Sequence, residues 1–156
     1  MIAQIQDNFL TDETCAELIN FFEENKNLQE IYRNTFVITI TNIDRFKDLL
    51  NKINNYFLKH NSKVDWIQIV KWPVNSFQVL HNDATSDQTT LSSICYLNDN
   101  YSGGQTFFEE GTVFTPKKRR MLFFDGMYYK HGVTMVRGEI RYTLATWYKQ
   151  NEKIKF

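Results

Sequence analysis

From residue 64 to residue 149 the chain alternates short apolar segments with links that carry Asn, Asp, Gly or Pro. The segments are rich in β-branched and aromatic residues, and segments of this length that end in turn-forming residues predict strands. Many short strands in succession are typical of an antiparallel barrel or sandwich. We expect strands at residues 65–71, 76–81, 90–97, 105–109, 121–124, 131–136 and 140–149.

The first 62 residues have a different pattern, which predicts two helices. Apolar residues recur at helical spacing between residues 15 and 22, and Thr11 is suited to cap the helix that carries them. We predict that a second helix begins near Thr41, with Asp44 at the capping-box position. Short strands are expected at residues 2–5 and 35–40.

The length of 156 residues suits one domain. We therefore expect a single domain, residues 1–156, with a helical part at about 1–62 and a β core at about 64–149. These expectations define a mainly β protein with flanking helices, of the α+β class.

Composition restricts the partners and the location. Eighteen basic residues balance eighteen acidic ones, which argues against a dedicated nucleic-acid or membrane-surface binder. No segment reaches the roughly 18 apolar residues of a membrane span, and the N-terminus does not resemble a signal peptide. Cys15 and Cys95 are expected to be small buried side chains. We expect a cytoplasmic protein that does not contact a membrane.

One of only three histidines, His81, ends an apolar segment two residues before Asp83. Side chains two apart on a strand point the same way, so both groups can reach one cation if the extended conformation persists. Taken alone, the pair favours a simpler interpretation, in which a strand-end histidine is followed by a turn-forming Asn-Asp.

Two later residues change this balance. His131 follows a second apolar run, and two histidines with one carboxylate are the ligand set of the facial triad of non-haem iron enzymes. Arg141 shares a strand face with Ala145 and Trp147. An unpaired buried cation is costly, and a bound dicarboxylate would pair with Arg141 in bidentate fashion.

Six short motifs follow one another in this half of the chain. They are HND (81–83), YLND (96–99), GGQTFF (103–108), TPKKRRMLFFDG (115–126), KHG (130–132) and RYTLATWY (141–148). In their order and spacing they resemble the Fe(II)- and 2-oxoglutarate-dependent dioxygenases, most closely the prolyl 4-hydroxylase-like branch. The resemblance implies a double-stranded β-helix (jelly roll), iron(II), 2-oxoglutarate as cosubstrate and ascorbate as a reductant.

The resemblance also implies roles for individual residues. His81, Asp83 and His131 match the metal ligands, and Arg141 matches the basic residue that pairs with the distal carboxylate of 2-oxoglutarate. Tyr96 matches a tyrosine whose hydroxyl contacts the cosubstrate in some members.

The chain departs from the family pattern at one position of the pocket. Trp147 matches a wall residue, but Ala145 stands where some members have a hydroxyl that also contacts the distal carboxylate. A second donor must then come from elsewhere, with Thr106 and Tyr96 as the candidates.

Two positions indicate the branch of the family. Related halogenases lack the carboxylate that Asp83 supplies, so its presence favours hydroxylation. Nucleic-acid demethylases usually carry a second arginine where this chain has Trp147, which argues against a nucleic-acid substrate.

The predicted function is an oxygenase that hydroxylates a prolyl residue of a peptide or protein. The alternatives are an oxygenase acting on a small molecule, a non-catalytic jelly-roll module that binds metal without turnover, and a cupin-type metal enzyme without 2-oxoglutarate. Arg141 argues against the last alternative, because such an enzyme would not need a cation on an inner strand face. The basic run 117–120 is interpreted as a solvated turn, with contact to an acidic substrate as the alternative.

Overall fold

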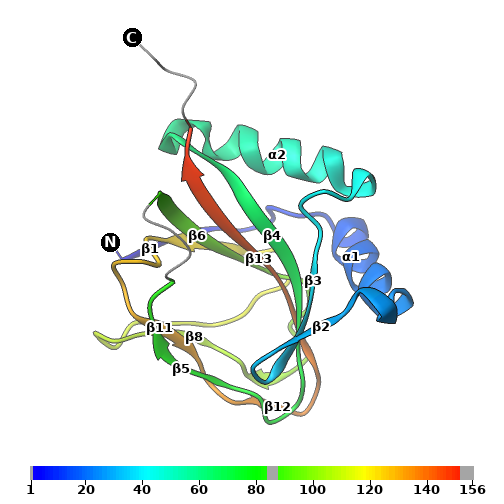
Figure 1. Ribbon diagram of the computed structural model, residues 1–156. Coiled ribbons are helices and arrows are strands. Elements are labelled where there is room, and N and C mark those ends of the chain that lie inside the picture. The colour runs from blue at the N-terminus through cyan, green and yellow to red at the C-terminus, as the bar shows by residue number, and fades with distance from the viewer. Residues whose placement is uncertain (1, 84–87, 152–156) are drawn as a thin grey trace.

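The computed structural model describes residues 2–83 and 88–151, and its two main sheets face each other (Figure 1). The larger sheet has the strand order β1-β10-β6-β13-β4-β3-β2. Its strands are β1 (Ala3–Gln6), β2 (Glu30–Tyr32), β3 (Thr35–Thr39), β4 (Ser62–Trp72), β6 (Thr89–Tyr96), β10 (Met121–Phe124) and β13 (Arg141–Gln150).

The smaller sheet has the order β5-β11-β8-β9, and a two-stranded ladder, β12-β7, accompanies it. All strand pairings among the described residues are antiparallel, so the predicted jelly roll with flanking helices is confirmed. The strands are β5 (Gln78–His81), β7 (Ser102–Gly103), β8 (Thr106–Phe108), β9 (Val113–Phe114), β11 (His131–Val133) and β12 (Val136–Arg137).

Two helices, α1 (Asp12–Glu24) and α2 (Lys47–Phe57), cover the outer face of the larger sheet (Figure 1). Thr11 caps α1 as predicted, because its hydroxyl accepts a hydrogen bond from the Thr14 amide at 3.1 Å. The main core lies between these helices and the sheet, and it includes Leu18, Phe22 and Phe57, all fully buried. Within the described residues, no helix is long and apolar enough to span a membrane.

Side chains alternate along β4 and β13, so that one set faces this core and the other set faces a cavity between the two sheets. Ile67, Ile69 and Leu144 point toward the helices and have no exposed surface. The alternate residues line the cavity. On β4 these are Trp66, Gln68, Val70 and Trp72, and on β13 they are Arg141, Thr143, Ala145 and Trp147.

The second helix begins later than predicted. A 3₁₀ turn occupies Asp44–Phe46, α2 starts at Lys47, and no side chain caps it. Thr41 is not its N-cap, because its hydroxyl accepts a hydrogen bond from the Ile67 amide at 3.1 Å. The Thr41 hydroxyl, which the sequence predicted as a helix cap, is therefore bonded to β4.

Two strand predictions also need correction. The segment 131–136 is not one strand, because the Thr134 amide turns to the Gln105 carbonyl and separates β11 from β12. The N-terminal part also contributes strands to the larger sheet, namely β1, β2 and β3. Of these three, β2 was not predicted.

The basic run 117–120 binds the N-terminal segment of the chain instead of forming a simple solvated turn. Arg120 donates to Asp7 at 2.6 Å, and Arg119 donates to the Leu10 carbonyl at 2.8 Å. Lys118 pairs with Asp12 at 3.2 Å. These contacts hold the link between β1 and α1 against the segment that precedes β10.

The Asp7–Arg120 pair predicts a pH-dependent contribution to stability. The hydrogen bond from Arg120 lowers the pKa of Asp7 below its usual 3.8. The pair therefore stabilises the fold above that value and is lost as the pH falls through the lowered pKa. We expect Asp7→Asn to lower the urea midpoint at neutral pH and to reduce the loss of stability below about pH 4.

Glu17→Gln is the matched control for this measurement, because the Glu17–Arg45 pair is exposed. Exposed pairs contribute little, so the control should keep the wild-type urea midpoint. An equal effect of both variants would contradict a specific role for Asp7.

Candidate metal centre

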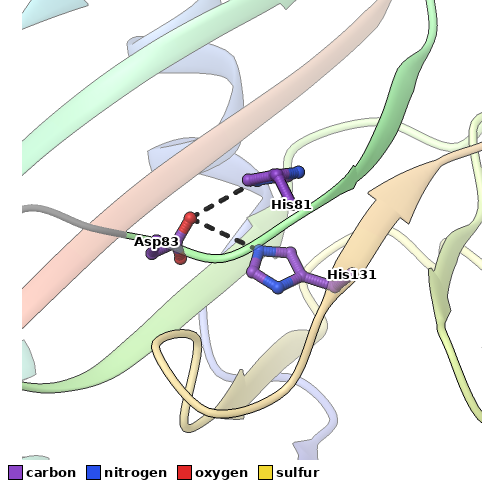
Figure 2. Close-up of side chains that lie close together, drawn as sticks. All are labelled: His81, Asp83 and His131. Carbon is purple, nitrogen blue, oxygen red and sulfur yellow. Dashed lines mark ion pairs between the residues drawn. The ribbon is translucent and has the colours of Figure 1, made fainter.

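His81, Asp83 and His131 converge at the end of the smaller sheet (Figure 2). His81 and His131 are register partners on β5 and β11, so the ladder itself places the two rings side by side, with centroids 4.4 Å apart. The Asp83 amide donates to the Gly126 carbonyl at 2.8 Å, which holds the carboxylate beside the rings. One carboxylate oxygen, Oδ1, lies 3.4 Å from Nε2 of each histidine.

Hydrogen bonds behind the three groups orient them for a metal ion. Nδ1 of His81 lies 3.0 Å from the Val79 carbonyl, and Nδ1 of His131 lies 2.9 Å from the Tyr129 carbonyl. A carbonyl can only accept, so each Nδ1 carries a proton, and a neutral ring then presents the lone pair of Nε2 to a metal ion. Such partners fix the tautomer that binds metal.

The carboxylate is held in the same way. Ser92 donates its hydroxyl proton to Oδ2 of Asp83 at 2.7 Å and leaves Oδ1 directed at the histidines. The potential ligand atoms all lie within 4.8 Å of one another. Two imidazole nitrogens and one carboxylate oxygen with open positions suit a divalent iron site.

The surroundings of Asp83 keep its carboxylate ionised, which favours the binding of a cation. Burial raises the pKa of Asp83, but hydrogen bonds from His131, His81 and Ser92 outweigh it, so the pKa lies below its usual range. Burial lowers the pKa of His81, but Asp83 outweighs it and the pKa is raised. A divalent cation would replace the proton that Asp83 attracts to the His81 ring.

Beside the centre lies a cavity of about 630 Å³ between the sheets, which is a typical size for a small-molecule site. The centre is on its wall, and so are the inward residues of β4 and β13. Ser92 and Trp66 are both register partners of Trp147, so this row of the sheet lies next to the centre.

Arg141 lies in another row of the same face, beside its register partner Trp72. Its side chain is only 1% exposed, and its guanidinium carbon lies 4.8 Å from the Trp72 ring and 5.5 Å from the Tyr96 ring. Its Nε and Nη2 are buried without a hydrogen-bond partner among the described residues. A buried cation with free donors requires an anion, and a carboxylate matches its fork.

Of the other predicted pocket residues, Thr106 and Trp147 line the cavity, and Tyr96 lies beside Thr106. The hydroxyls of Tyr96 and Thr106, both fully buried, lie 2.7 Å apart and bond to each other. Trp147 packs against Trp66 with ring centroids 4.9 Å apart. The structure thus brings the predicted metal ligands together, with Arg141 on the same cavity and Tyr96 beside it.

Four residues of the site were not predicted as functional. Ser92 and Gly126 position Asp83, while Trp72 and Tyr101 lie against Arg141. Only Trp72 had a usable signal, because it directly follows the predicted strand 65–71; in the structure it is the register partner of Arg141. Nothing local in the sequence marks the other three.

One comparison with known proteins shows the family. The family model of the 2OG-Fe(II) oxygenase superfamily matches residues 67–149. No curated protein sequence matches the chain.

Solved structures with the same fold cover nearly the whole chain. A viral collagen prolyl hydroxylase from Paramecium bursaria Chlorella virus-1, in complex with 2-oxoglutarate, is 18% identical with a TM-score of 0.79, over 99% of this chain and 97% of that one. A Pseudomonas putida prolyl-4-hydroxylase is 17% identical with a TM-score of 0.80, over 96% and 92%. A Trichoplax adhaerens prolyl hydroxylase, bound to a hypoxia-inducible-factor peptide fragment, is 17% identical with a TM-score of 0.80, over 97% and 84%.

The packing around Asp83 predicts an effect of Gly126→Ala on metal binding. A Cβ at this position would lie 2.5 Å from both Oδ2 of Asp83 and the hydroxyl of Ser92. One of these groups must move, and loss of such support typically weakens metal binding about 10- to 100-fold. Titration of the protein with manganese(II), followed by calorimetry, measures this loss.

Gly111→Ala is the control, since a Cβ there meets nothing within 4 Å. Its positive φ of 107° should lower stability without changing metal affinity. Wild-type metal affinity in Gly126→Ala would show that metal binding does not depend on the position of Asp83 and Ser92 against Gly126.

Proposed function

Because the chain belongs to the 2OG-Fe(II) oxygenase superfamily, we propose that it hydroxylates a prolyl residue of a peptide or protein. The superfamily uses iron(II) and 2-oxoglutarate. The observation that carries the proposal is a buried Arg141 with unpaired donors on the same cavity as the His81–Asp83–His131 centre.

The residues of the cavity fit both groups. His81, Asp83 and His131 would hold the iron, and Arg141 would bind the distal carboxylate of 2-oxoglutarate. When bound, iron and cosubstrate supply the oxidation of a C–H bond by dioxygen, with succinate and carbon dioxide as coproducts. The chain itself contributes position and a partly enclosed cavity.

Each contribution of the chain can be assigned to a contact. The carbonyls of Val79 and Tyr129 keep the protons on Nδ1, so that both Nε2 atoms stay free for the metal. The rings of Trp72 and Tyr96 confine the guanidinium of Arg141. A confined cation loses little entropy when it binds the cosubstrate, and two fixed anchors orient one small molecule across the cavity.

The rim of the cavity supports a peptide over a small molecule. Ile31 and Tyr32 on β2, together with Phe77 and Val79 around β5, line the cavity and are between 44% and 76% exposed. Exposed apolar side chains gathered at a cavity mouth are typical of a surface that binds another chain. The prolyl hydroxylases that share the fold, one of them bound to a peptide fragment, support the same choice.

A peptide assay tests the proposed reaction. Iron-loaded protein with 2-oxoglutarate and ascorbate is incubated with a library of proline-containing peptides and with matched peptides in which alanine replaces proline. We expect the mass of one oxygen atom to be added to proline-containing peptides alone, with succinate formed in equal amount.

The other outcomes identify the alternatives. Succinate formation that depends on a small molecule and never modifies a peptide would assign a small-molecule oxygenase. Metal binding without succinate under any condition would assign a non-catalytic module.

Arg141→Met tests the anchoring of the cosubstrate. The variant keeps an unbranched side chain between the two rings but removes the charge. We expect metal affinity to be retained and 2-oxoglutarate affinity to fall by about 100-fold or more, since removing one partner of a buried charge pair costs several kcal/mol. Calorimetry on manganese-loaded protein measures both affinities.

Arg137→Met is the matched control, because Arg137 is exposed on β12. It should bind 2-oxoglutarate as the wild type does. Full cosubstrate affinity in Arg141→Met would refute the anchoring role.

A further inference from the structure

A second buried polar group without a partner lies near Arg141. Tyr101 is in the link between β6 and β7, and its ring packs against a small cluster of buried apolar residues. Its hydroxyl oxygen is buried and has no hydrogen-bond partner among the residues that the structure describes. A buried hydroxyl without a partner costs free energy, so such a group needs an explanation. The cluster consists of Val37, Val70, Trp72, Val133 and Val136.

Gly104 shows how closely Tyr101 and Arg141 lie together. A Cβ on Gly104 would be 2.9 Å from Cδ of Arg141 and 2.9 Å from Cε2 of Tyr101, so both side chains converge on one point. Gly104 has a φ of 61°, and its missing side chain makes room for both. Burial raises the pKa of the Tyr101 hydroxyl, and the positive charge of Arg141 opposes this effect.

The anion that Arg141 binds needs more donors than Arg141 offers. The two oxygens of a carboxylate accept about four hydrogen bonds, whereas Arg141 has free donors on Nε and Nη2. Position 145, where related enzymes can carry a further hydroxyl, is Ala145. The hydroxyls of Tyr96 and Thr106 bond to each other, which uses one of their two protons, while the hydroxyl of Tyr101 has no partner among the described residues.

We propose that Tyr101 donates its hydroxyl proton to the distal carboxylate of 2-oxoglutarate, beside Arg141. This inference rests on the proposed function and names a residue that binds the cosubstrate. Tyr101 thereby replaces the hydroxyl that Ala145 lacks. The free energy lost by burying its unpaired hydroxyl is recovered when the cosubstrate binds. The site therefore favours a ligand that carries a distal carboxylate.

Tyr101→Phe tests the proposal, because it removes the hydroxyl and keeps the ring in its cluster. Dissociation constants are measured by calorimetry on manganese-loaded protein for 2-oxoglutarate and for 2-oxopentanoate, which has the same carbon chain without the distal carboxylate. We expect about tenfold weaker binding of 2-oxoglutarate, as for the loss of one hydrogen bond to a charged group. Binding of 2-oxopentanoate should not change.

Stability and a control variant separate this role from a structural one. Without 2-oxoglutarate, Tyr101→Phe should unfold at the wild-type temperature or above it, since the removed hydroxyl had no partner. Tyr128→Phe removes an exposed phenol and should leave every constant unchanged.

Three results would overturn the inference. Wild-type affinity for 2-oxoglutarate in Tyr101→Phe, together with lost affinity in Arg141→Met, would refute the role of Tyr101 and leave the proposed function intact. Equal weakening of both ligands would show that Tyr101 only shapes the cavity. Failure of the wild-type protein itself to bind 2-oxoglutarate would refute the proposed function as well.

Discussion

The site depends on the pairing of β13 with β4 on one side and with β6 on the other. The alternation along β13 gives one face to the helical core, through Leu144 and Tyr148, and the other to the cavity, through Arg141 and Trp147. The burial of the first face holds the second in place. A slip of one residue would move Arg141 into the apolar core, so the register of this strand sets both stability and the site.

The two sheets contribute different parts of the chemistry. The smaller sheet supplies both histidines as register partners, while the larger sheet supplies Arg141 and the serine that orients Asp83. Asp83 belongs to neither strand ladder and is held by the Gly126 carbonyl and by Ser92. Metal and cosubstrate can therefore meet only when the two sheets are packed, and the helices behind the larger sheet indirectly support the centre.

Much of the fold could be predicted from local pattern, and the errors have a common cause. Residues 121–124 and the Thr11 cap were predicted correctly because alternation and capping are short-range properties. Thr41 was misassigned because its hydroxyl bonds to the Ile67 amide of β4, a partner that is remote in sequence. The basic run 117–120 was likewise interpreted without its partners, which lie more than 100 residues away.

By itself, the sequence determined the residue types of the site: two histidines, an acid and an arginine at strand ends or on an inward strand face. Such residues can be recognised because metal and carboxylate chemistry admits few side chains. Tertiary structure alone decided which groups orient them and which donors stay unpaired. Ser92, Gly126 and Tyr101 have no local signature, because their roles arise from distances across strands and loops. Close packing, unlike ligand chemistry, is a property of the assembled chain.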